Sequence, residues 1–217
     1  MLSGDGRALL RVSRGTVDRL YRVDLATGVM TRLDLPYVAF AGLGRVDADT
    51  AFASAAAVDA LPVLVTVDLR SGSHRVQRRS GDAPLASAAV SVPQAVDFAA
   101  APGADGRPQR AHAWFYPPHL PGHAVPAGEA PPLIVMLHGG PTSHSGPAFK
   151  SGVQFWTTRG FAVVDVNYGG SSGYGRAYRE RLRGQWGVVD LQDAVAAVDE
   201  LVARRWVDGA RVAIRGG

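Results

Sequence analysis

Short β-type runs separated by turn residues make up the first ninety or so positions of the chain. Residues 8–12, 20–24 and 63–67 are rich in Val and Leu, and the pairs Thr27-Gly28 and Ser71-Gly72 follow two of these runs. Hydrophobic runs of this length, bounded by Gly, Asp and Ser, predict β-strands joined by tight turns.

A weak repeat links two of these runs. Residues 21–28 read YRVDLATG and residues 65–72 read VTVDLRSG, so Asp24 and Asp68 lie 44 positions apart. A period of about 40 to 45 residues with several strands per unit is typical of β-propeller blades, whereas two ordinary hairpins with similar turns are the alternative. Because a propeller needs about four blades to close a ring, we expect residues 1–92 to form an incomplete set of propeller-like blades.

The pattern changes near residue 92, where we expect a domain boundary. The following stretch, up to residue 132, is rich in Pro, Ala and Gly and holds two candidate strands, 95–98 and 111–116. Beyond it lie three apolar runs of the kind that a buried parallel sheet produces, at 133–137, 161–166 and 211–214.

A long amphipathic helix is predicted between the last two runs. Apolar residues recur there with helical spacing, at Leu191, Ala194, Val195, Val198, Leu201 and Val202. Asp190 at the start and Arg204 at the end suit the helix dipole. Strand, helix and strand in this order predict a parallel βαβ unit, so residues 93–217 are expected to form an α/β domain.

Composition excludes several classes of protein. The 47% hydrophobic fraction of the 217 residues supplies a core, which excludes wholesale disorder. The absence of Cys excludes disulfide scaffolds, thiolate metal sites and cysteine nucleophiles. The net charge of +4 is small and scattered, and Lys150 is the one Lys among 23 basic residues, so no dedicated nucleic-acid surface is expected.

Membrane and export signals are not visible in the sequence. No segment approaches the roughly 20 unbroken apolar residues that span a bilayer, and residues 1–6 lack a basic leader followed by an apolar run. We therefore expect no membrane association and a cytoplasmic location. The oligomeric state is left open.

Two glycines at the end of the run 133–137 suggest catalytic chemistry. His138, Gly139, Gly140 and Pro141 follow this predicted strand directly. Glycines at the carboxyl end of a strand let the backbone turn tightly and present N–H groups, which suits stabilisation of an oxyanion during acyl transfer. A structural Gly-Pro turn beside an incidental His is the alternative.

Ser171 formally matches the G-x-S-x-G pattern of a serine nucleophile, at residues 169–173. The order of the residues argues against that role. In an α/β-hydrolase the base histidine follows the serine, but the last histidine of this chain is His144. We expect a serine-glycine loop instead.

Two other groups of residues resemble functional sites weakly. His119 and His123 have the spacing of a helical metal pair, but Pro121 and Gly122 between them disfavour a helix, and no metal or other cofactor is expected. A cluster of arginines is expected to form a solvated helix face opposite an apolar side of Tyr174, Tyr178 and Leu182, and comprises Arg176, Arg179, Arg181 and Arg183.

The last seven residues, RVAIRGG, describe a short strand that runs into Gly216 and Gly217. A strand followed by Gly-x is how a nucleophile elbow begins, with the serine as the next residue. Gly216 and Gly217 are therefore expected to be the entry to such an elbow.

From Pro132 to Gly217 the chain resembles the catalytic domain of the prolyl oligopeptidase family, in its acylaminoacyl-peptidase and dipeptidyl-aminopeptidase-like branch. The resemblance rests on ordered motifs, namely HGGP at 138–141, NYGGSSGYG at 167–175, Trp186-Gly187 with Asp190 and Asp193, and RGG at 215–217. One departure lies at Gly169, where relatives commonly have Arg, which makes substrate preference less transferable.

This resemblance implies a β-propeller followed by an α/β-hydrolase domain, and serine-dependent hydrolysis of short peptides through an acyl-enzyme. It implies that the Gly140 N–H is one oxyanion donor and that His138 and Gly139 help to form the loop. The nucleophile is expected directly after Gly217, so that no triad residue is present in residues 1–217 and the chain is truncated and inactive as written.

Two other hypotheses stay open at this point. The chain could be a complete, non-catalytic binding protein with a degenerate hydrolase half. It could also belong to an esterase with the same HGGP loop, although the propeller-like repeat favours peptides.

Overall fold

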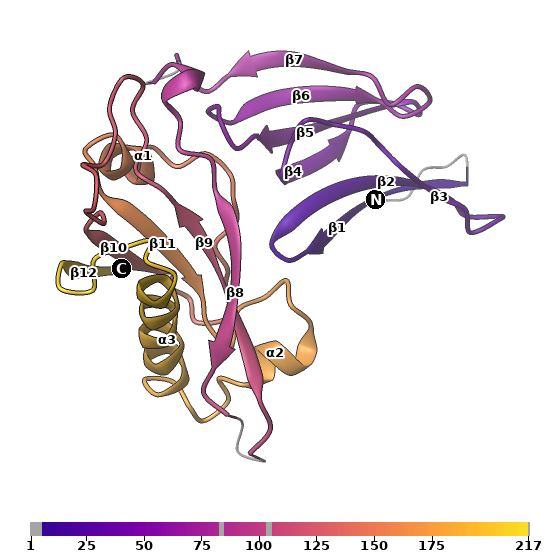
Figure 1. Cartoon of the computed structure of the whole chain (residues 1–217). Coiled ribbons are helices and arrows are strands. Elements are labelled where there is room, and N and C mark those ends of the chain that lie inside the picture. The colour runs from indigo at the N-terminus through magenta and orange to yellow at the C-terminus, as the bar shows by residue number, and fades with distance from the viewer. Residues whose placement is uncertain (1–5, 83–84, 103–105, 217) are drawn as a thin grey trace. The chain divides into compact units, whose positions relative to one another are not determined.

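Neighbouring strands pair in order along the first part of the chain, as short runs joined by tight turns do. The structure is a computed structural model that describes residues 6–82, 85–102 and 106–216 (Figure 1). Seven strands form this part, namely β1 (Arg7–Arg14), β2 (Val17–Asp24), β3 (Met30–Arg32), β4 (Ala39–Arg45), β5 (Thr50–Ala56), β6 (Val63–Asp68) and β7 (His74–Arg79). They build a three-stranded sheet, β1-β2-β3, and a four-stranded sheet, β4-β5-β6-β7, in which all neighbours are antiparallel.

The sequence repeat corresponds to the same turn in both sheets. After β2, the Asp24 carboxylate accepts N–H bonds from residues 26 and 27 at 3.0 and 2.9 Å. After β6, the Asp68 carboxylate accepts N–H bonds from residues 70 and 71 at 2.9 and 2.7 Å. Because side chains alternate between the faces of each strand, the inward ones form one core that includes Leu20, Val65 and Val67. The blade-like organisation predicted from the repeat is confirmed.

The second part of the chain holds a mixed sheet with helices. Its elements are η1 (Ser87–Ala89), β8 (Gln94–Ala100), β9 (Gln109–Tyr116), β10 (Leu133–Leu137), α1 (Ser151–Thr157), β11 (Ala162–Asn167), α2 (Arg176–Glu180), α3 (Val189–Ala203) and β12 (Val212–Gly216). The strand order is β12-β10-β11-β9-β8. β10 is parallel to both β11 and β12, whereas β9 is antiparallel to β11 and to β8.

Each face of this sheet has its own apolar core. Along β11 every residue is buried, as the continuous apolar run predicts. Val164 and Val166 belong to the core that includes Leu201 of α3, whereas Val163 belongs to the core that includes Val153 of α1. The sheet is therefore covered on both faces, which is the layered α/β arrangement expected from the sequence.

Helix α3 exists where the apolar spacing predicts it, but its buried side is narrower than the predicted stripe. Ala194 and Leu201 are buried, whereas Leu191 and Val195 are 54% and 60% exposed. The stripe thus covers two adjacent sides of the helix, and only one of them packs on the sheet. Among the described residues no helix is both long and apolar enough to cross a bilayer.

The chain divides into two compact units. One comprises Met1–Pro84 with Gly146–Phe149, and the other comprises Leu85–Ser145 with Lys150–Gly217. The boundary predicted at residue 92 falls shortly after the start of the second unit. The short return of residues 146–149 to the first unit has no signature in the sequence, and it includes a bond from the Phe149 N–H to the Ala57 carbonyl at 2.8 Å.

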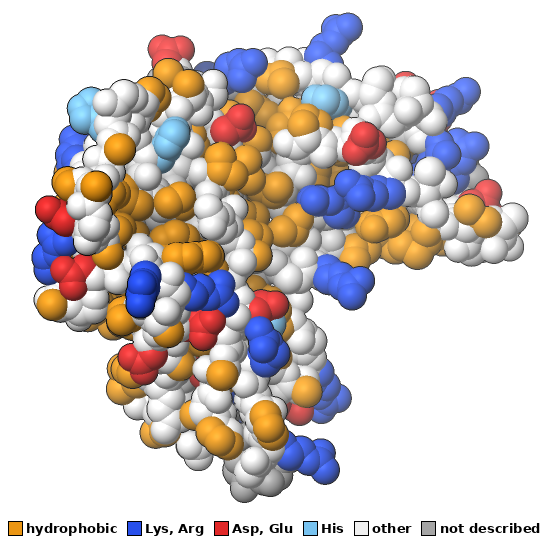
Figure 2. Space-filling model, in the orientation of Figure 1, with side chains coloured by type: hydrophobic (Ala, Val, Ile, Leu, Met, Phe, Trp, Pro, Cys, Tyr) orange, Lys and Arg blue, Asp and Glu red, His pale blue; other side chains and the backbone are white. Residues whose placement is uncertain are grey.

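Basic side chains are spread over the visible face of the molecule and are interspersed with apolar and acidic ones (Figure 2). Several are engaged with carboxylates of their own unit, among them Arg70 with Asp49 and Arg176 with Glu180.

Candidate functional site

The carboxyl ends of β10 and β12 meet at one edge of the sheet. The two strands are parallel neighbours, and Leu137, the last residue of β10, pairs with Gly216, the last residue of β12. His138 begins the loop that follows β10. The end of β12 at Gly216 therefore lies beside the start of the 138–141 loop. Gly217 lies outside the described residues. This edge is where open α/β sheets bind their ligands.

The loop after β10 turns sharply at its second glycine. Gly140 has a φ of +66°, a backbone conformation that favours glycine. A bond from the Ser143 N–H to the Gly140 carbonyl, 3.0 Å long, closes the turn. Gly139 and Gly140 are both exposed, and within the described part of the chain neither N–H donates to another group. The loop thus presents free backbone donors at the sheet edge.

His138 is held by the loop after β11. Its ring stacks on Tyr168 with the centroids 4.5 Å apart, and the Tyr168 hydroxyl donates to the His138 carbonyl at 2.9 Å. The Ser171 hydroxyl donates to the Tyr168 carbonyl at 2.7 Å. With that proton placed, the His138 Nε2 carries its own proton and donates to Ser171 Oγ, also at 2.7 Å. Burial lowers the pKa of His138, so the ring favours the neutral form. The main opposing influence is the bond that Nδ1, 3.2 Å from the Gly139 carbonyl, would donate only in the protonated ring.

Ser171 occupies a structural position. Its side chain is fully buried, and its hydroxyl is engaged with both His138 and Tyr168. A nucleophile must instead reach substrate and hand its proton to a base. The neighbouring Ser172 lies 2.8 Å from Nδ1 of His144, in a more exposed position.

Asn167 connects the same two loops. This buried side chain ends β11, where the apolar pattern stops. Its Oδ1 accepts the Ser145 N–H at 2.8 Å and its Nδ2 donates to the Ser145 carbonyl at 2.9 Å. A further bond runs from the Ser172 N–H to the Ser143 carbonyl at 2.9 Å. The 138–145 loop is therefore attached to the 167–175 loop at both of its ends and in its middle.

Asp193 of α3 holds the start of the 167–175 loop. Its fully buried carboxylate accepts the Gly169 N–H at 2.7 Å and pairs with the Arg181 guanidinium at 3.2 Å. Burial raises the pKa of Asp193, and the Gly169 N–H and Arg181 oppose that shift. The prediction of a solvated arginine face is wrong for Arg181, whose side chain is only 12% exposed. The buried carboxylate on the next helix draws it inward, which the pattern of its own segment does not reveal.

Lys150 forms an ion pair with a residue of the sheet. The Lys150 ammonium lies 2.5 Å from the carboxylate of Asp165, a buried residue in the middle of β11. A carboxylate in such a position needs a partner of opposite charge. The pair anchors the start of α1 against the sheet.

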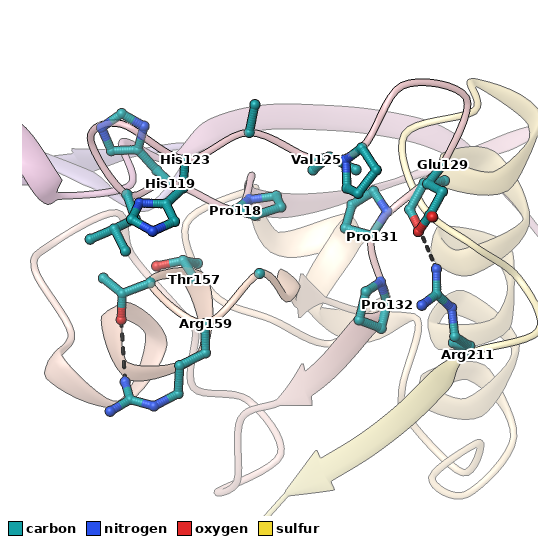
Figure 3. Close-up of a pocket in the computed structure, with 16 residues that line it drawn as sticks. Pro118, His119, His123, Val125, Glu129, Pro131, Pro132, Thr157, Arg159 and Arg211 are labelled. Atoms are coloured by element: carbon teal, nitrogen blue, oxygen red, sulfur yellow. Dashed lines mark hydrogen bonds between the residues drawn. The ribbon is translucent and has the colours of Figure 1, made fainter.

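His119 and His123 lie at the opposite edge of the sheet, away from this loop. They line a hollow of about 470 Å³ near the amino ends of the parallel strands, together with Pro132, Arg159 and Arg211 (Figure 3). The His119 Nε2 contacts the Ala88 carbonyl at 2.9 Å, and the His123 Nδ1 contacts the Pro121 carbonyl at 3.2 Å. Residues 119–123 are not helical, and among the described residues no three His, Asp or Glu side chains are grouped as a metal site.

The sequence predicts the glycine loop but not the residues whose hydrogen bonds fix its position. Tyr168 and Asn167 belong to a motif that the sequence singles out, yet their contacts with His138 and Ser145 join segments more than twenty positions apart. A signal was present in Asn167, because a polar residue that ends a fully apolar strand is expected to find a buried partner.

The chain is similar to several known proteins. Residues 147–217 match the prolyl oligopeptidase family. A puromycin-hydrolyzing peptidase of Mycobacterium tuberculosis, a solved structure, is 41% identical and superposes with a TM-score of 0.90, over 100% of this chain and 33% of that one. An uncharacterized peptidase of Bacillus subtilis, YuxL, is 32% identical over 130 residues, which are 59% of this chain and 18% of that protein.

The acylamino-acid-releasing enzyme of Arabidopsis thaliana is also similar. It is 36% identical over 90 residues, which are 42% of this chain and 12% of that enzyme. The chain thus spans about a third of the solved structure and less than a fifth of each of these two curated relatives. The motifs, the sheet order and these likenesses agree that the chain is similar to proteins of the prolyl oligopeptidase family.

Proposed function

We propose that this chain is part of a serine-type peptidase of the prolyl oligopeptidase family, which hydrolyses the peptide bonds of short peptides through an acyl-enzyme. The observation that carries the proposal is the register of β10 and β12. It brings the exposed, unengaged N–H of Gly140 to the same sheet edge as the end of β12. A nucleophile and an oxyanion donor must meet in this way for acyl transfer.

In this proposal each residue of the loop has one role. The Gly140 N–H donates to the oxygen of the tetrahedral intermediate, where negative charge develops. Neutral His138, fixed by Tyr168 and Ser171, keeps the loop in place and does not act as the base. Gly216 and Gly217 lead into the nucleophile elbow, and the serine is the residue after Gly217. The N–H of the residue after that serine is the second oxyanion donor.

The 217-residue chain by itself is proposed to form no acyl-enzyme. Ser171, which matches the nucleophile pattern, is fully buried and its hydroxyl is already engaged with two partners. The triad acid and histidine are proposed to lie after Gly217 as well. Without a triad, only the weak catalysis of an oxyanion site and substrate binding would be left.

The substrate class is proposed from the relatives. The similar proteins include a puromycin-hydrolyzing peptidase and an acylamino-acid-releasing enzyme. The first is named for hydrolysing puromycin and the second for releasing acylamino acids. We therefore propose short substrates with an accessible amide bond near one end. The cytoplasmic location expected from the sequence stays a prediction.

Hydrolysis assays on the protein encoded by the whole reading frame test this proposal. The substrates are puromycin, an N-acetylated dipeptide p-nitroanilide, and an ester matched to the anilide in its acyl group. The expected result is hydrolysis of at least one amide substrate, which a fluorophosphonate abolishes. Cleavage of the ester with no cleavage of either amide would instead indicate an esterase. No hydrolysis of any of the three would favour a binding protein.

A further inference from the structure

A row of polar side chains crosses three adjacent strands and ends at the 138–145 loop. Asp97 of β8 pairs with His112 of β9, and His112 pairs with Asn167 of β11 in the next ladder. Residues directly opposite one another on neighbouring strands share one face of the sheet. Asn167 is the residue that binds both backbone groups of Ser145. The row therefore connects the outer strand β8 with the loop that carries Gly140.

The two ends of this row differ in burial. The Asp97 side chain is 58% exposed, that of His112 is 23% exposed, and Asn167 is fully buried. The His112 Nδ1 lies 2.6 Å from the Asp97 carboxylate. A carboxylate bound to one ring nitrogen fixes the orientation of an imidazole. Asp97 thus sets the plane of the His112 ring.

Tyr174 lies over that ring and reaches Asn167. The rings of Tyr174 and His112 are parallel within 2° and their centroids are 4.1 Å apart. The Asn167 Nδ2 donates to the Tyr174 hydroxyl at 3.2 Å, besides its bond to the Ser145 carbonyl. Tyr178 contacts the same ring from α2, with centroids 5.2 Å apart, and donates its hydroxyl to the Asn167 carbonyl at 2.5 Å. Both tyrosines that hold Asn167 therefore contact His112.

We propose that His112 is a positioning residue: oriented by Asp97, its ring holds Tyr174 and Tyr178 against Asn167 and so sets the position of the loop that carries Gly140. The inference rests on the proposed function for its catalytic meaning. The positioning itself depends only on the contacts above. His112 acts on the loop through Asn167, because the Asn167 side chain binds the backbone of Ser145.

Hydrogen exchange on the 217-residue chain tests the positioning directly. The Ser145 N–H, which donates to Asn167, is the reporter, and the amide of Val135 in β10 is the reference. Substituting His112→Ala removes the ring, His112→Phe keeps a ring without the bond to Asp97, and Tyr174→Phe removes only the hydroxyl. His123→Ala, at the other edge of the sheet, is the matched control.

The expected result is faster exchange at Ser145 relative to Val135, by about tenfold in His112→Ala, which corresponds to the loss of roughly one hydrogen bond. Tyr174→Phe should give a smaller increase in the same ratio. His112→Phe should recover part of the protection, because the stack on Tyr174 is retained. His123→Ala should leave the ratio unchanged.

An unchanged ratio in His112→Ala would overturn the proposal. Equal acceleration of Ser145 and Val135 in this variant would also overturn it, because that is the effect of general destabilisation. If His112→Ala does not fold, His112→Phe decides, because it removes the bond to Asp97: an unchanged ratio in that variant would overturn the proposal.

Kinetics separate this inference from the proposed function. In the protein encoded by the whole reading frame, His112→Ala is expected to lower kcat for an amide substrate with little change in KM, because a displaced Gly140 N–H weakens binding of the transition state. If no peptide is cleaved but exchange at Ser145 rises as expected, the proposed function fails and the positioning stands. If peptides are cleaved and the exchange ratio does not change, the positioning fails and the proposed function stands.

Discussion

At the scale of single residues, the 167–175 loop is built around glycines that the surrounding side chains require. Gly170 has a φ of +122°, and a Cβ at this position would lie 2.7 Å from both Cβ and Cδ2 of Leu182, a buried residue. At Gly169 a Cβ would lie 2.7 Å from the Arg181 Cζ. The guanidinium of Arg181 therefore fills the space beside Gly169.

Gly170→Ala is expected to lower the free energy of unfolding by roughly 2 to 4 kcal/mol, from the strained backbone and from overpacking against Leu182. Urea denaturation measures the difference. Gly152→Ala in α1 is the matched control: no atom lies within 4 Å of a Cβ placed there, and the change should raise the free energy of unfolding by about 0.5 to 1 kcal/mol. Similar losses in both variants would contradict this account of the loop.

His138 predicts a dependence of stability on pH. Its pKa in the folded chain lies below the ordinary value of 6.5 because the ring is buried. Between the two pKa values the unfolded chain binds more protons than the folded chain, so the free energy of unfolding falls as the pH drops below about 6.5. The contribution of neutral His138 to stability is fully present above that pH. Unfolding midpoints in urea between pH 5 and 8 should show this slope, and His138→Gln should reduce it. An identical slope in His138→Gln would mean that other groups cause it.

At the scale of elements, the sequence pattern predicted the strands best where burial is complete. The runs 133–137 and 161–166 coincide with β10 and β11 to within one residue, because strands buried on both faces tolerate few polar residues. The short helix α1 was not predicted, since packing of Val153 on β11 rather than any local signal stabilises it. Local signals are also insufficient for α3. The spacing of its apolar residues predicts a helix, but not which of its two apolar sides packs on the sheet.

Substitutions on the two sides of α3 should therefore differ. Leu201→Ala removes a fully buried side chain from the core and is expected to lower the free energy of unfolding by about 2 to 5 kcal/mol. Leu191 is 54% exposed, so Leu191→Ala should change the free energy of unfolding by less than about 1 kcal/mol. Thermal or urea unfolding of the two variants checks this, and a larger loss from Leu191→Ala would contradict the packing described.

The repeated turn of the first unit also makes a prediction. Asp68→Ala removes the acceptor for the N–H groups of residues 70 and 71 and should lower the urea midpoint of this unit. Asp68→Asn keeps an acceptor oxygen and should lower it less. Equal effects of the two substitutions would show that the carboxylate charge, rather than the turn bonds, is what matters.

At the scale of the whole molecule, motif order predicted the family and the two kinds of domain, whereas the assembly of the site needed the structure. HGGP and NYGGSSGYG can be read from the sequence, but which residues of one motif hold the other follows from strand register, as for Asn167 and Ser145. For Ser171 the order of the residues already argues against a nucleophile, and the structure adds that its buried hydroxyl contacts His138 and Tyr168.

We propose that the edge formed by β10 and β12 belongs to a serine peptidase whose nucleophile follows Gly217. Fluorophosphonate labelling of the protein encoded by the whole reading frame, with the labelled residue located by mass spectrometry, tests it most directly. A single labelled serine is expected at the position directly after Gly217, and no label is expected on the 217-residue chain alone. Labelling of Ser171 or Ser172, or a reading frame that ends at Gly217, would contradict it.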